Sequence, residues 1–258
     1  MERSFILPHG KLQIPCAVTM PQSGQVRRVV LGVHGLGGSM HDPIQAGIAE
    51  EMALFSSAAV RFDLPAHGSS PENDRTLSLK NCREALLAVA EWIRGEFPDV
   101  EDLCIFATGF GAYVTLTALR ELIQLPGRVK LVVQTPSVLM HETILSMLSR
   151  NRETLWAMDA VTIPAPRPLE VTYAFYEELR ANIALATQPI PMLILHGEED
   201  DFIRMEDIQN FRRINERSKL VIIPGTSHRF LEEGAWDMVL DLTRDWFSFE
   251  QVLLCDWE

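Results

Sequence analysis

Strand-like apolar runs alternate with helix-like amphipathic segments along most of this 258-residue chain. The runs at residues 28–33, 58–62 and 103–107 are mainly apolar, as expected of strands buried on both faces. Between the last two runs, apolar residues recur at helical spacing from Leu79 to Ile93. This alternation predicts an α/β fold, with a mostly parallel sheet and helices on both of its faces.

About eight strands are expected in the sheet. Further strands are predicted at residues 129–134, 192–195 and 219–223. Two more, roughly residues 4–7 and 11–19, open the chain and are separated by a His-Gly turn. We expect this antiparallel pair at one edge of the sheet.

Residues 136–189 break the alternation. They have a proline-rich centre and two predicted helical pieces, roughly at residues 140–150 and 171–186. An insertion here would cover the carboxyl edge of the sheet, where open α/β sheets bind ligands. We therefore expect a core formed by residues 1–135 and 190–258, with a cap at 136–189. A decorative insertion without a role in binding is the alternative.

Charge and composition exclude several classes of partner. The net charge of −12 disfavours nucleic acid and anionic membrane surfaces. The N-terminus lacks the pattern of a signal peptide, and the four scattered cysteines indicate a reducing compartment, so a cytoplasmic location is expected.

Neither a cofactor nor a metal is expected, because phosphate-loop, nucleotide and metal-ligand patterns are missing from the sequence. The oligomeric state stays open between monomer and homodimer.

A sharp strand-to-helix turn is predicted at residues 104–112, where an apolar run meets Ala-Thr-Gly-Phe-Gly and an apolar helix follows. This is the layout of a nucleophile elbow, which presents a reactive side chain on a tight turn. The central position should carry Ser, Cys or Asp. Here it is Gly109, which has no side chain to react.

Three other loops follow predicted strands and carry polar residues. Residues 34–38, His-Gly-Leu-Gly-Gly, could present backbone N–H groups to an anion, although a plain turn is the commoner role of such a loop. Asp200 and His228 each follow a late strand, so both are expected at the same edge of the sheet. A carboxylate and an imidazole placed in this way can pair, and the acid then fixes the histidine tautomer.

The order of elbow, acid and histidine is that of the α/β-hydrolases. Over roughly residues 28–247, the chain resembles small cytoplasmic serine esterases of this superfamily, including feruloyl and cinnamoyl esterases. Residues 34–38 resemble their oxyanion loop. Residues 61–68 resemble their Asp-x-Pro-Gly-His-Gly loop, although plain turn residues would also explain that segment. The resemblance implies an α/β-hydrolase fold with a helical cap, and a small-molecule ester or carboxylic acid as the ligand.

The resemblance also implies a role for each matching residue. Asp200 would be the triad acid, His228 the triad base, and Gly109 the non-functional nucleophile position. Relatives place an apolar residue three positions after the acid. Ile203 stands three positions after Asp200, so Asp201 is the weaker candidate for the acid. The oxyanion hole would be formed by the amides of Leu36 and Phe110. The expected ligand contacts are His34, Gly35, Gly37 and Thr108.

Substitutes for the missing nucleophile are weak. Thr108 is flanked two residues away by Phe106 and Phe110, which are too bulky for the close turn. Ser137 follows a strand on the correct edge but is not on an elbow. Four hypotheses stay open: a non-hydrolytic ligand-binding homologue, an enzyme in which His228 and Asp200 activate water, a serine esterase with an engineered Gly109, and a scaffold protein.

Overall fold

One eight-stranded sheet forms the centre of the computed structural model, which describes residues 2–22, 26–148 and 157–248. The strand order is β1-β2-β4-β3-β5-β6-β9-β10. The strands are β1 (Glu2–His9), β2 (Leu12–Thr19), β3 (Arg28–Val33), β4 (Ser57–Phe62), β5 (Asp102–Thr108), β6 (Arg128–Gln134), β9 (Leu193–Gly197) and β10 (Lys219–Ile223). From β4 to β10 all neighbours are parallel, whereas β2 is antiparallel to both β1 and β4. The predicted parallel sheet with an antiparallel hairpin at one edge is confirmed.

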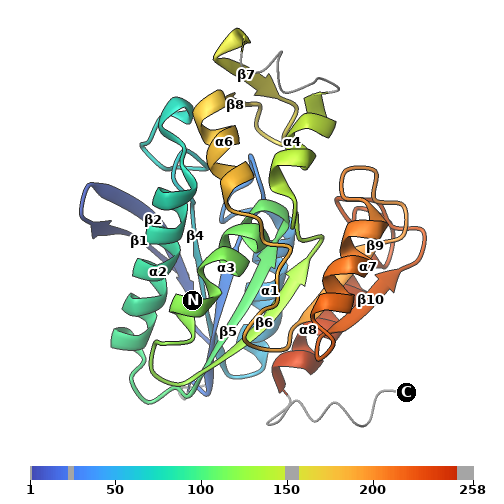
Figure 1. Ribbon diagram of the computed structural model, residues 1–258. Coiled ribbons are helices and arrows are strands. Elements are labelled where there is room, and N and C mark those ends of the chain that lie inside the picture. The colour runs from blue at the N-terminus through green and yellow to red at the C-terminus, as the bar shows by residue number, and fades with distance from the viewer. Residues whose placement is uncertain (1, 23–25, 149–156, 249–258) are drawn as a thin grey trace.

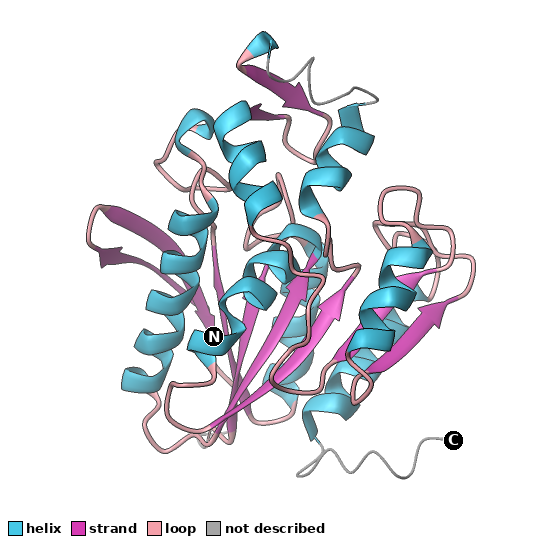
Figure 2. Cartoon of the chain, in the orientation of Figure 1, coloured by secondary structure: helices cyan, strands magenta, loops and turns pink. Residues whose placement is uncertain are grey.

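Helices cover both faces of the sheet (Figures 1 and 2). On one face lie α2 (Leu79–Glu96), α3 (Gly109–Leu122) and α7 (Met205–Ile214); on the other lie α1 (Pro43–Leu54) and α8 (Ala235–Ser248). Successive strand residues point to opposite faces, so the continuous apolar runs supply both cores. In β5, for example, Ile105 belongs to the core under α2 and α3, and Phe106 belongs to the core under α1 and α8.

The segment that follows β6 lies beyond the carboxyl ends of the central strands, at the top of Figure 1. It contains α4 (Met140–Leu148), β7 (Ala160–Ile163), β8 (Leu169–Thr172) and α6 (Tyr173–Ala181). The antiparallel β7–β8 pair was not predicted. The second helical piece, expected over residues 171–186, is shorter at both ends. It begins after Thr172, whose hydroxyl caps the helix by accepting from Phe175 N–H at 3.1 Å, and it ends before Asn182, whose backbone leaves the helical conformation. Residues 149 and 150 of the first piece lie outside the described residues.

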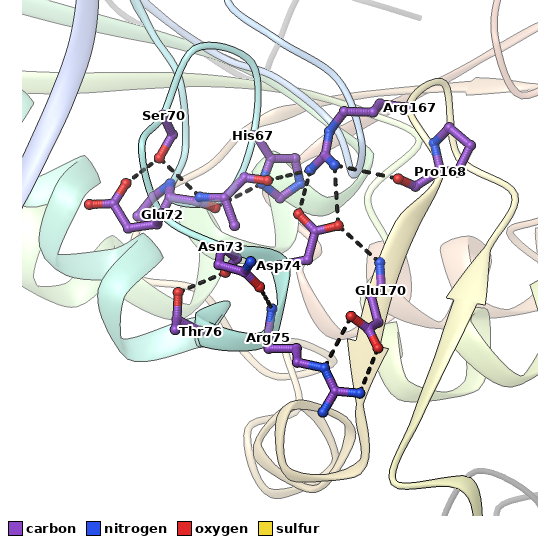
Figure 3. Close-up of polar contacts among 12 residues, drawn as sticks. His67, Ser70, Glu72, Asn73, Asp74, Arg75, Thr76, Arg167, Pro168 and Glu170 are labelled. Carbon is purple, nitrogen blue, oxygen red and sulfur yellow. Dashed lines mark hydrogen bonds and ion pairs between the residues drawn. The ribbon is translucent and has the colours of Figure 1, made fainter.

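A cluster of charged residues joins the β7–β8 hairpin to the loop that follows β4 (Figure 3). The Arg167 guanidinium donates to Asp74 at 2.9 Å and to the Ala66 carbonyl at 2.5 Å, and Arg75 pairs with Glu170 at 2.8 Å. The Arg167 amide also donates to the Gly37 carbonyl at 3.0 Å. Exposed ion pairs are individually weak, but these are combined with backbone contacts. Together they hold the hairpin beside the loop that follows β3.

Candidate active site

Gly109 is the first residue of α3 and follows β5 directly. Its φ angle is +49°, in the left-handed region that glycine adopts without strain. A Cβ atom built at this position would have a single neighbour within 4 Å, the Gly35 Cα at 3.9 Å. The space in front of the turn is therefore open.

Gly111 is a glycine for a different reason. A Cβ atom at this position would lie 2.3 Å from the His34 carbonyl oxygen and 2.6 Å from that of Val33. The start of α3 thus rests directly on the end of β3, and only a glycine permits this approach. The contact brings the first turn of the helix next to the Gly-rich loop at residues 34–38.

Asp200 and His228 form the pair that the sequence predicts. The His228 Nδ1 lies 2.8 Å from Asp200 Oδ2, and the Asp200 side chain is wholly buried. The other carboxylate oxygen accepts from the amides of Phe202 and Ile203, each at 2.9 Å. Burial alone would raise the pKa of Asp200, but these hydrogen bonds and the nearby imidazole hold the pKa below its ordinary value. Asp201 is exposed and takes no part in the pair.

The paired histidine is oriented for chemistry at the cavity. Because Nδ1 faces Asp200, Nε2 is the ring nitrogen left for a ligand. The ring also contacts Phe202 edge to face, with the two ring centroids 5.2 Å apart. An imidazole held in this way can accept a proton from a hydroxyl or from a water molecule placed at Nε2.

The amides of Leu36 and Phe110 lie on the two segments that meet at the elbow. Phe110 is in the first turn of α3, where backbone N–H groups have no acceptor within the helix. Among the described residues, neither amide has a backbone acceptor. Free amides beside a helix N-terminus favour negative charge, which is what an oxyanion hole requires. The geometry is compatible with the predicted role.

One cavity of about 340 Å³ brings most of the predicted site together. It is lined by Gly35, Leu36, Thr108, Gly109, Phe110 and His228. Asp200 lies behind His228 and does not reach the cavity. Pro164, Ala165 and Pro166, from the loop between β7 and β8, line the cavity from the other side. Residues of the expected core and of the expected cap thus share this space.

His34 and Gly37 do not line the cavity, contrary to their expected role as ligand contacts. The His34 ring is wholly buried: Nδ1 lies 2.8 Å from the Gly35 carbonyl oxygen, and Nε2 accepts from Leu64 N–H at 3.0 Å. Burial lowers the pKa of His34 to about 4, so the ring is neutral. Its observed contacts tie the loop after β3 to the loop after β4. Gly37 faces the hairpin, since a Cβ there would lie 2.5 Å from that of Ala165.

A second buried histidine, His67, lies beside His34, with ring centroids 5.2 Å apart (Figure 3 shows its surroundings). Its Nδ1 is 2.9 Å from the Pro65 carbonyl oxygen, and its ring stacks on that of Phe110. Burial, together with the neighbouring His34, lowers the pKa of His67 to about 3. Both histidines are therefore neutral at neutral pH and connect the loops that support the elbow.

Acid should destabilise the fold through these two histidines. Their folded pKa values lie below about 6.5, the value in an unfolded chain, so the unfolded state takes up protons first. The contribution of the two histidines to the free energy of unfolding is therefore fully present above about pH 6.5. It decreases as the pH falls toward the folded pKa values of about 4 for His34 and about 3 for His67. At about pH 5 the loss is about 2 kcal/mol for each histidine. Urea unfolding at about pH 7.5 and at about pH 5 would test this. Between these two pH values, the free energy of unfolding of His67→Phe should decrease by about 2 kcal/mol less than that of the native chain. Identical pH dependence in the two proteins would contradict this assignment.

Several polar residues at the cavity were not singled out from the sequence. Gln134 and Thr135 come from the end of β6 and the loop after it, and Thr143 comes from α4. Ser137, which the sequence did single out, also lines the cavity. Ser137, the weak substitute nucleophile, donates its amide to the Gly109 carbonyl at 3.4 Å. The signal that could have found Gln134 is its place at a strand's carboxyl end, on the edge where the other site residues lie.

Metal-binding and membrane-spanning features are both missing from the described part of the chain. No group of three or more His, Cys, Asp or Glu residues there is arranged to hold a metal ion. Within the same ranges, no helix is both long and apolar enough to cross a bilayer. Cys16, Cys82 and Cys104 are buried free thiols, and Cys255 lies outside these ranges.

Comparison with known proteins gives one family match and many similar folds. Residues 30–242 match the alpha/beta hydrolase family. A sequence search of curated proteins found no match. A putative hydrolase from Agrobacterium vitis S4 superposes with a TM-score of 0.81 at 19% identity, covering 96% of this chain and 98% of that one. Est1E from Butyrivibrio proteoclasticus, solved with ferulic acid bound, gives 0.80 at 17% identity, covering 93% and 96%.

The mouse alpha/beta hydrolase domain-containing protein 10 is a third similar structure, with a TM-score of 0.75 at 15% identity, covering 94% of this chain and 97% of that one. At these identities the structural likeness establishes the fold alone. The sequence match spans the parallel strands from β3 to β10 and most of α8. The chain therefore belongs to the alpha/beta hydrolase family.

Proposed function

We propose that this chain is an esterase-like α/β-hydrolase homologue that binds a small acyl or aromatic ester or acid and does not form an acyl-enzyme. One observation carries the proposal. The pair of Asp200 and His228 is assembled beside the cavity, but the residue at the elbow is Gly109. Residues 136–189 would act as the cap over this ligand.

The missing hydroxyl has a large expected effect on catalysis. Loss of the serine in a comparable triad enzyme lowers turnover by on the order of a million-fold. The oxyanion donors and substrate binding still leave roughly a thousand-fold acceleration over water. The covalent pathway should therefore be absent, whereas ligand binding does not depend on the hydroxyl.

The cavity supports the binding role. Its volume of about 340 Å³ lies in the range of small-molecule sites. Its lining is largely apolar, including Met140, Phe202 and Trp236, and the amides at the elbow supply polar contacts at one end. The ferulic acid bound to Est1E shows that a structurally similar protein holds an aromatic acid. A small acid or ester suits both the apolar walls and the amide donors.

Ligand binding should raise the melting temperature of the native chain. We expect butyrate, benzoate or ferulate at about 100 times its Kd to add about 2.7 kcal/mol of stability. This corresponds to an increase of roughly 5–10 °C for a protein of this size. Differential scanning fluorimetry over a concentration series of each acid would measure it.

A matched pair of variants locates the binding. Met147 lines the cavity from α4, so Met147→Trp should fill part of it and abolish the shift. Met238 is 43% exposed and lies outside the cavity, so Met238→Trp should keep the shift. A flat response of the native chain to all three acids would refute the proposed function.

A further inference from the structure

We propose that Gln134 binds a hydroxyl group on the acyl part of the ligand, on one of the carbon atoms nearest the carbonyl. The ligand class would then be short hydroxyacyl esters or hydroxy acids. This inference rests on the proposed function and adds the substrate class. It comes from a polar side chain at the cavity whose acceptor atom has no donor in the described structure.

Gln134 is the last residue of β6, and its side chain is almost wholly buried, with 4% of the residue exposed. It lines the cavity. Its Oε1 atom is buried, and no donor reaches it among the described residues. A buried carbonyl oxygen without a donor is costly, so native proteins seldom keep one that has no use. In the described rotamer no solvent-sized group reaches this oxygen, so a ligand donor in the cavity would satisfy it once the carboxamide turns about its terminal bond, a torsion with a broad energy well.

The position of Gln134 fixes which part of a ligand it could meet. In the parallel register of β5 and β6, Gln134 is paired with Thr108, the residue just before Gly109. Neighbouring strands are about 4.8 Å apart, so Gln134 stands one strand spacing from the elbow. A ligand carbonyl held at the elbow amides would place its nearest carbon atoms beside this side chain. Groups farther along an acyl chain would lie beyond it.

The backbone next to Gln134 gives a second, independent observation. Thr135 also lines the cavity, and its φ angle is +43°. Side chains branched at Cβ rarely adopt this conformation, and such outliers gather at functional sites. The Thr135 amide donates to the Leu195 carbonyl at 2.8 Å, which fixes the loop in place. The strained turn directly after Gln134 thus lies at the same cavity, and the pairing of β6 with β5 and β9 fixes Gln134 there.

The chemistry of the surroundings selects a neutral donor. Among the residues that line the cavity, the charged side chains other than the histidine are Asp42 and Arg229, and Arg229 is exposed. Gln134 itself carries no charge, so a ligand ion placed against it would have no buried countercharge. A hydroxyl group both donates and accepts, so it satisfies a carboxamide in either orientation. A hydroxyl on the acyl chain fits these requirements.

Isothermal titration of the native chain with butyrate, 2-hydroxybutyrate and 3-hydroxybutyrate tests the proposal. At least one hydroxy acid should bind about 5- to 100-fold more tightly than butyrate, the range expected when a buried acceptor gains its donor. Gln134→Met keeps the length of the side chain and removes its hydrogen bonds. In this variant the preference should disappear while butyrate still binds. The exposed Gln124→Met is the matched control and should keep the preference.

The outcomes separate this inference from the proposed function. If all three acids bind the native chain equally, the hydroxyl contact is refuted and the ligand-binding role stands. A preference that survives in Gln134→Met would also refute it, because another residue would then be the acceptor. If none of the acids binds, and benzoate and ferulate also fail, both proposals fall. The comparison of the three acids uses the native chain alone, so it decides the question even if Gln134→Met misfolds.

Discussion

Gly109→Ser is expected to convert this chain into a serine esterase. The new Cβ has room, since its single near neighbour would be the Gly35 Cα at 3.9 Å. The serine hydroxyl would enter the cavity that His228 lines, with the imidazole already held by Asp200 at 2.8 Å. We expect hydrolysis of p-nitrophenyl butyrate to rise by on the order of 10³- to 10⁶-fold. A burst of p-nitrophenol and labelling by a fluorophosphonate would mark the acyl-enzyme pathway.

Two further variants separate nucleophilic catalysis from other effects of the substitution. Gly109→Ala adds the same Cβ without a hydroxyl and should gain neither activity nor label. Adding His228→Ala to Gly109→Ser should remove the gain, because the serine then has no base. A folded Gly109→Ser protein that stays unlabelled would show that Asp200, His228 and the amides of Leu36 and Phe110 are not positioned for catalysis. Burst-free hydrolysis by the native chain that His228→Ala abolishes would instead support direct activation of water.

Sequence periodicity predicted the sheet well because β3, β5 and β6 are buried on both faces. In such strands every residue faces a core, so the apolar run is continuous and easy to recognise. The β7–β8 hairpin was missed because it is short and lies outside the main sheet. Its position depends on contacts such as Arg167 with Asp74, which are 93 residues apart in the sequence. Local patterns carry no information about pairings of this kind.

The candidate site shows the same division between local and long-range information. Asp200 and His228 follow parallel strands, so their meeting at one edge follows from topology alone. The burial of His34 does not follow from topology, because it depends on a hydrogen bond from the Leu64 amide, in another loop, to His34 Nε2. Motif position placed His34 near the site correctly but could not tell a ligand contact from a residue that supports the loop. Side-chain direction decides that difference.

Gly109→Ala and Gly111→Ala, two residues apart, should have very different effects on stability. At Gly111 the new methyl group would lie 2.3 Å and 2.6 Å from two backbone carbonyl oxygens, and backbone cannot rotate away as a side chain can. We expect Gly111→Ala to cost about 3 kcal/mol or more, the upper end of overpacking effects. At Gly109 the methyl group has space, and the φ of +49° should cost about 1 kcal/mol.

Urea unfolding of the two alanine variants would measure the difference as a shift in midpoint at constant m-value. The result bears on what Gly109 is for. A mild effect at Gly109 means that the fold tolerates a side chain there, so the glycine reflects a site without acyl-enzyme chemistry. Equal destabilisation by both substitutions would mean that the turn itself demands glycine at position 109. In that case the turn would not accept any side chain at position 109. Gly109→Ser would then lack esterase activity because the protein misfolds, and not because the other site residues are wrongly placed.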